Sequence, residues 1–114
     1  MDAFEKLEVW KRSSRLCSDV FNAFRDSRDW SFKDQIVRSA LSVPSNIAEG
    51  YERNSRNEYV RFLKIAKGSC GELRTQLYIA KDVEILDSQR ANVFLQEATE
   101  ISKMLQAIIG KLVG

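Results

Sequence analysis

The stretch RSALSVPSNIAEGYER, residues 38–53, carries the observation that decides the fold. Its apolar residues recur at intervals of three and four, as on one face of an α-helix, and the pattern passes through Pro44 without losing phase. A proline removes one helical hydrogen bond and crowds the carbonyl four residues earlier, at a cost of about 3 kcal/mol when nothing compensates. The unbroken pattern therefore predicts a helix over residues 32–50 that bends at Pro44 and ends near Gly50.

The opposite side of this segment is polar and consists mostly of small residues. It comprises Gln35, Ser39, Ser42, Asn46, Glu49 and Arg53, at steps of four and three. Two interpretations stay open: the stripe faces solvent, or it contacts a second subunit. The candidate residues for such a contact are Pro44, Ser45, Asn46, Glu49 and Gly50. A ligand pocket lined by Asn46 and Glu49 is the functional alternative to a purely structural bend.

Three further amphipathic segments make the chain all-α. Helices are predicted over residues 4–25, 56–82 and 88–112. The helix-start signals are Asp2 with Glu5, Ser55 with Glu58, and Asp87 or Ser88. Four helices of similar length with short connections predict an antiparallel up-down-up-down four-helix bundle. A chain of 114 residues fits one such domain, spanning residues 1–114.

Two glycines lie inside the predicted helix 56–82. Gly68 and Gly71 each cost about 1 kcal/mol relative to alanine in a helix interior. The segment AKGSCG has almost no side-chain bulk, which favours close approach of another backbone. Gly68 and Gly71 are therefore a second candidate for a subunit contact.

The composition argues against an enzyme. The chain has no histidine, and its two cysteines do not have the spacing of a metal site. We predict no catalytic residue, no metal and no cofactor; an acid–base role for Glu49 beside a lysine or arginine is the weaker alternative. The apolar runs are too short to cross a bilayer, and acidic residues near the start argue against a signal peptide, so we expect a cytoplasmic protein.

Three segments carry a resemblance to a known family. They are FEKLEVWKRS at the start, QIVRSALSVPSNIAEG in the second helix, and EYVRFLKIAKGSCGELRTQL in the third, and VPSNIAEG, residues 43–50, is the most specific of them. The chain resembles the bacterial four-helix-bundle proteins encoded in intervening sequences of 23S ribosomal RNA genes, the S23 type. The resemblance implies an assembly of five bundles and no known catalytic activity. Related bundles that accompany the reverse transcriptase of diversity-generating retroelements are pentameric and are implicated in nucleic-acid binding through a basic surface.

The charge distribution agrees with a basic surface. Residues 53–81 hold seven basic and two acidic side chains, a net charge of +5, in a chain whose total is +2. The candidate nucleic-acid-binding residues are Arg53, Arg56, Arg61, Lys64, Lys67 and Arg74. A solvated helix face is the structural alternative, but repetition in a homo-oligomer would form a basic ring that attracts phosphates. We therefore expect binding to RNA, DNA or a nucleoprotein without base-specific readout; the alternative is a scaffold whose basic face binds an acidic protein.

Overall fold

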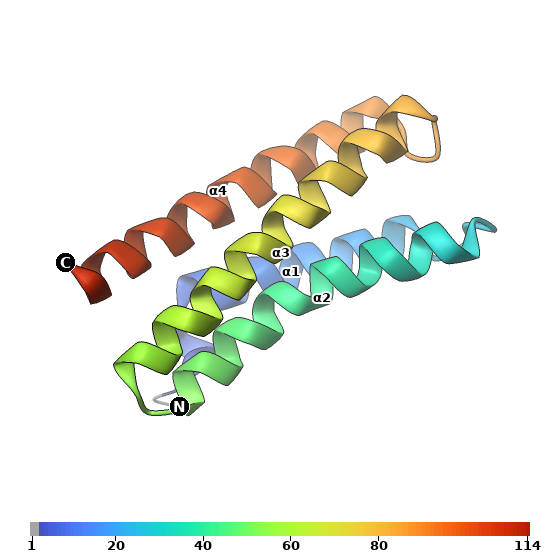
Figure 1. Cartoon of the computed structure of the whole chain (residues 1–114). Helices are drawn as coiled ribbons and strands as arrows, with labels where there is room; N and C mark the ends of the chain where they lie inside the picture. Colours follow the sequence, from blue (N-terminus) through green and yellow to red (C-terminus); the bar gives the residue numbers. More distant parts are fainter. Residues whose placement is uncertain (1–2) are drawn as a thin grey trace.

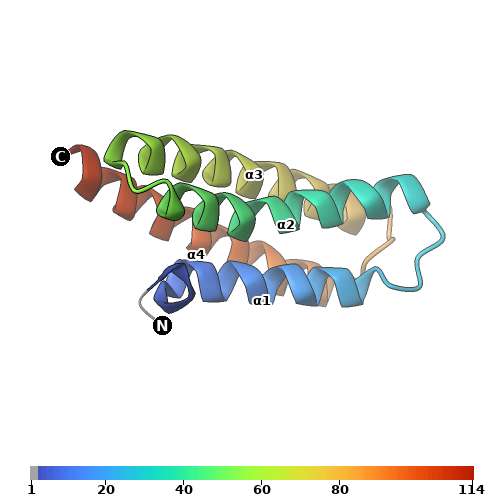
Figure 2. The same ribbon diagram turned by 90° about the horizontal axis from the view of Figure 1, so that it is seen from below.

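Four α-helices run alternately up and down along one long axis in the computed structural model, which describes residues 3–114 (Figure 1). They are α1 Glu8–Ala23, α2 Trp30–Glu52, α3 Arg56–Asp82 and α4 Ser88–Val113. Each helix packs on its chain neighbours, and α4 also packs on α1, which places α1 diagonally opposite α3. The α2–α3 turn lies at the same end of the bundle as the C-terminus (Figure 2). The predicted all-α, antiparallel four-helix bundle is confirmed.

The first helix begins later than the sequence predicts. A short 3-10 helix, η1, covers Phe4–Lys6, and Leu7 then has an extended backbone before α1 starts at Glu8. The predicted start signal at Asp2 lies outside the described residues. Helix α2 begins at Trp30, two residues before the predicted position. Both differences involve helix ends, where local signals compete with the packing of neighbouring segments.

The starts of α3 and α4 are those that the capping signals predict. Ser55 Oγ accepts a hydrogen bond from the Glu58 backbone N–H at 3.3 Å, and α3 spans the predicted residues 56–82. Asp87 Oδ2 accepts one from the Arg90 N–H at 2.9 Å, and α4 runs one residue beyond its predicted end. In both helices a side-chain oxygen satisfies an N–H that has no partner within the helix.

Helix α2 continues without interruption through Pro44 and past Gly50. Pro44 is buried, together with Val43 and Ile47 of the same apolar face. The side chain of Asn46 donates to the Ser42 carbonyl at 2.8 Å, so it does not compensate the Ala40 carbonyl that the proline leaves without its usual donor. Gly50 was predicted to end the helix, but the left-handed residue of the turn is Asn54, at φ 55°.

The middle of the polar stripe of α2 packs against α3. Ser42 and Ser69 share a hydrogen bond between their hydroxyls at 2.8 Å, and Asn46 Nδ2 donates to Ser42 Oγ at 2.9 Å. This middle part is therefore an interface within the chain, which neither of the two interpretations anticipated, whereas both ends of the stripe are exposed. The α2–α3 contact is the most extensive in the molecule. We call it the α2–α3 seam, defined by Ser42, Asn46 and Gly50 on α2 and by Phe62 and Ser69 on α3.

The glycines of α2 and α3 have opposite surroundings. A Cβ added to Gly50 would lie 2.6 Å from Phe62 Cβ, closer than real side chains approach, and 3.3 Å from Tyr59 Cδ1, which is a tight contact. A Cβ added to Gly68 or Gly71 would meet nothing within 4 Å. The close backbone approach therefore occurs at Gly50, while Gly68 and Gly71 lie exposed on the surface of α3. No other helix of the described chain approaches Gly68 or Gly71, and their contact with a second subunit stays a prediction.

We predict that Gly50→Ala destabilises the protein by about 1–3 kcal/mol, because the added methyl group forces α2 away from Phe62. Gly68→Ala and Gly71→Ala should each stabilise it by about 0.5–1 kcal/mol, since alanine is the better helix former and the space is open. Urea unfolding monitored by circular dichroism measures all three. A neutral Gly50→Ala would contradict the close seam, and a destabilising Gly68→Ala would indicate a contact with another chain.

Candidate nucleic-acid interface

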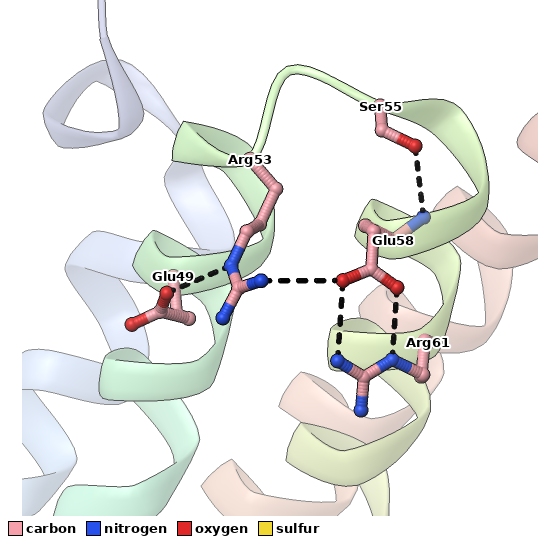
Figure 3. Close-up of polar contacts among 5 residues, drawn as sticks. All are labelled: Glu49, Arg53, Ser55, Glu58 and Arg61. Carbon is pink, nitrogen blue, oxygen red and sulfur yellow. Dashed lines mark hydrogen bonds and ion pairs between the residues drawn. The ribbon is translucent and has the colours of Figure 1, made fainter.

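The six predicted cations lie in two groups with different partners. Arg53 follows α2, and the other five lie on α3. Arg53 and Arg61 are engaged by carboxylates at the α2–α3 turn (Figure 3). Arg56, Lys64, Lys67 and Arg74 make no ion pair within residues 3–114. The structure therefore divides a set that the sequence presented as one.

Glu58 is the centre of the engaged group. Its carboxylate accepts from Arg61 Nε at 3.0 Å and from an Arg61 terminal nitrogen at 3.2 Å. Arg53 reaches the same carboxylate at 3.4 Å and also donates from Nε to Glu49 at 3.0 Å (Figure 3). The hydrogen bond from Arg61, followed by the charges of Arg61 and Arg53, lowers the pKa of Glu58. The two negative charges of Glu49 and Glu58 thus cancel the two positive charges of the arginines at this turn.

Both guanidinium groups of this cluster also lie over one aromatic ring. Arg53 Cζ is 4.9 Å and Arg61 Cζ is 4.5 Å from the centre of the Phe62 ring, which is itself buried beside Gly50. Such cation–π contacts add to the ion pairs in holding the two arginines. The cluster closes the α2–α3 turn, which gives Arg53 and Arg61 a structural role.

Three of the four unpaired cations, Lys64, Lys67 and Arg74, lie along α3 beyond this turn, and Arg56 lies next to it. Lys64 and Lys67 border a shallow groove between α3 and α4, whose other lining residues are Gly68, Gln106, Ile109 and Val113. Arg56 is exposed at the start of α3. Arg74 is half-buried, and its Nε is buried without a hydrogen-bond partner. Phosphate oxygens are suitable partners for such uncompensated lysine and arginine side chains.

The remaining candidate residues are spread over core and surface. Pro44 and Gly50 are buried in the bundle, whereas Ser45, Gly68 and Gly71 are exposed. Asn46 is half-buried and bonds to Ser42, but the Glu49 side chain is 53% exposed and pairs with Arg53. Asn46 and Glu49 therefore make separate contacts and do not line a shared pocket as the alternative supposed.

The cysteines have the environment of packing residues. Burial raises the pKa of Cys70 to about 12, and burial also raises the pKa of the half-buried Cys17. Both thiols are therefore protonated near neutral pH, which removes the nucleophilic thiolate form.

In the described part of the chain, no three His, Cys, Asp or Glu side chains gather where a metal ion could bind. None of the helices over residues 3–114 combines the length and apolar character needed to span a bilayer.

Two features escaped the sequence reasoning. Tyr78 is 54% exposed on the same side of α3 as the unpaired cations, so an aromatic side chain does lie among them. Its spacing of four from Arg74 was the available signal.

The second feature joins α1 to α4: Arg12 donates twice to Glu97, at 2.6 and 2.9 Å, and the pairing lowers the pKa of Glu97. Residues 85 apart in sequence give no local signal for such a pair.

Both the sequence and the fold of this chain are similar to those of known proteins. A family model described as 23S rRNA-intervening sequence protein matches residues 5–107. The chain belongs to this family. A search of curated proteins finds no match. Among solved structures, a protein of unknown function from the S23 ribosomal protein family of Bacteroides thetaiotaomicron VPI-5482 is 25% identical. The alignment covers 89% of this chain and 97% of that one, with a TM-score of 0.83, so the two share the fold.

We predict that the Glu58 carboxyl titrates below its ordinary range and that Arg61→Gln raises its pKa, because the hydrogen bonds and positive charge of Arg61 are lost. A lowered folded-state pKa means that the pairing stabilises the fold above the unfolded pKa and is lost as pH falls through the folded one. NMR titration of the side-chain carboxyl carbon measures this. Arg90→Gln, which removes a charge paired with Asp87, is the control. An unshifted Glu58 in the native protein would contradict the network.

Proposed function

We propose that this family member is a non-enzymatic, self-associating accessory protein that binds RNA or DNA through the phosphate backbone, without base-specific readout. The observation that carries the proposal is the set of four cations on one helix, Arg56, Lys64, Lys67 and Arg74, which have no carboxylate partner among residues 3–114. Neutralising phosphates releases condensed counterions, which is the main source of sequence-independent affinity. Self-association would repeat this helix in each copy and extend the basic surface.

The ion pairs at the α2–α3 turn favour a smaller set of phosphate-contacting residues than the six predicted from sequence. Arg53 and Arg61 already donate to Glu49 and Glu58, so binding a phosphate would require breaking these contacts. Lysines 64 and 67 have no such competing partner within the described chain. Lys64 and Lys67 are therefore the two residues that we assign most directly to phosphate contact.

The expected behaviour is affinity for single-stranded or duplex nucleic acid that falls steeply with salt. Lys64→Gln with Lys67→Gln should weaken binding and reduce the slope of log affinity against log salt by about 1–2, because two phosphate contacts are lost. Fluorescence anisotropy with labelled oligonucleotides measures both the affinity and its salt dependence. A salt range of about 50–200 mM is suitable, because phosphate contacts change the affinity strongly over it.

The matched control is Lys11→Gln with Arg15→Gln. It removes the same charge from exposed positions on α1, diagonally opposite α3, and should leave affinity and slope nearly unchanged. Equal losses in both double variants would show attraction by net charge alone and contradict a defined interface. Absence of binding by the native protein at low salt, with recovery of an acidic protein after nuclease treatment, would favour a protein scaffold instead.

A further inference from the structure

One sector of α3 collects the unpaired cations together with an aromatic residue. At 3.6 residues per turn, positions three, four or seven apart share a face. By this spacing an arc of about 100° contains Lys64, Lys67, Gly71, Arg74, Tyr78 and Lys81. From Lys64 to Lys81 the sector is about 26 Å long at the helical rise. We call it the α3 strip.

The strip lies beside α4, and the α4 residues next to its two ends carry no charge. Lys81 Nζ donates to Asn92 Oδ1 at 2.9 Å, which fixes the register at one end of the strip. At the other end, Lys64 and Lys67 share a groove with Gln106, Ile109 and Val113. The α4 carboxylates have partners elsewhere: Glu97 bonds to Arg12 of α1, and Glu100 pairs with Lys103. The positive charge between Lys64 and Arg74 is therefore not compensated from α4.

Tyr78 supplies an aromatic surface within this positive field. Its side chain is 54% exposed, and it lies one helical turn from both Arg74 and Lys81. An exposed ring between cations is a stacking platform for a nucleobase. In a duplex the bases stay stacked and paired inside the helix, so only unpaired bases can reach such a ring.

The middle of the strip is bare. Gly71 lies in the strip between Lys67 and Arg74, Gly68 lies at the edge of the strip beside Lys64, and a Cβ at either position would meet no atom within 4 Å. The helix surface is therefore low there, and a sugar–phosphate chain can approach the backbone closely. The open space at Gly71 leaves room for an extended strand between the lysines and Tyr78.

We propose that the α3 strip binds single-stranded nucleic acid in preference to duplex, with phosphates on Lys64, Lys67 and Arg74 and a base stacked on Tyr78. This inference rests on the proposed function and specifies its substrate. It excludes the α2–α3 turn as the stacking site, because the Phe62 ring is buried and already lies under two guanidinium groups.

The test compares labelled oligo-dT, oligo-U and a hairpin duplex in fluorescence anisotropy with the full-length protein. The single strands should bind more tightly than the duplex. Tyr78→Ala should weaken single-strand binding by about five- to a hundredfold, the range measured for loss of one stacked base, and should leave duplex affinity and the salt slope unchanged. Tyr78→Phe keeps the ring and should keep the affinity.

Trp30→Ala is the matched control, since Trp30 is an aromatic residue that is 68% exposed beside Lys33 on α2, outside the strip. It should not change single-strand affinity. Circular dichroism confirms that each variant folds. If Lys64→Gln with Lys67→Gln weakens binding but Tyr78→Ala does not, or if the duplex binds more tightly, this inference is overturned and the proposed function stands. If the native protein binds neither strand nor duplex at low salt, both are overturned.

Discussion

The α2–α3 seam is the contact on which the rest of the structure depends. At Gly50 the absence of a side chain lets α2 approach Phe62. About two helical turns away, the hydroxyls of Ser42 and Ser69 form a direct hydrogen bond. Small residues make such an approach possible, because a larger side chain would separate the two helices. The hydrogen bond between the two hydroxyls also favours one register of the two helices, since it forms at only one axial alignment.

The seam determines which side of α3 remains available to a partner. With Phe62 and Ser69 directed to α2 and Cys70 and Leu73 in the core, the helix has its lysines and Tyr78 on the remaining surface, beside α4. The same arrangement brings Arg53 to Glu58 across the α2–α3 turn. One packing contact thus separates cations that close the turn from cations that stay open to phosphate.

The sequence predicts the helices well because their signals are local. Ser55 and Asp87 act as caps where expected, and the apolar pattern correctly carries α2 through Pro44. It predicts the site less well because charge partners depend on three-dimensional proximity. The Glu58–Arg61 pair is visible at a spacing of three, but the Arg53–Glu58 contact requires the geometry of the turn.

The glycines show the same limit in packing. Gly50 seemed to mark a helix end by its position after a periodic run, whereas its neighbours show that it marks the closest approach of two helices. Gly68 and Gly71 were assigned that role because composition reveals missing bulk but not which side of the helix lacks it. Burial and neighbour distances are needed to tell the two situations apart.

Native-state hydrogen exchange tests the central claim most directly, because it measures the opening free energy of each amide. If the seam holds the bundle together, the amides of residues 39–43 and 45–50 in α2 and of residues 62–73 in α3 should exchange slowest and only with global unfolding. Faster exchange there than in α1 and α4, through local opening, would contradict the account.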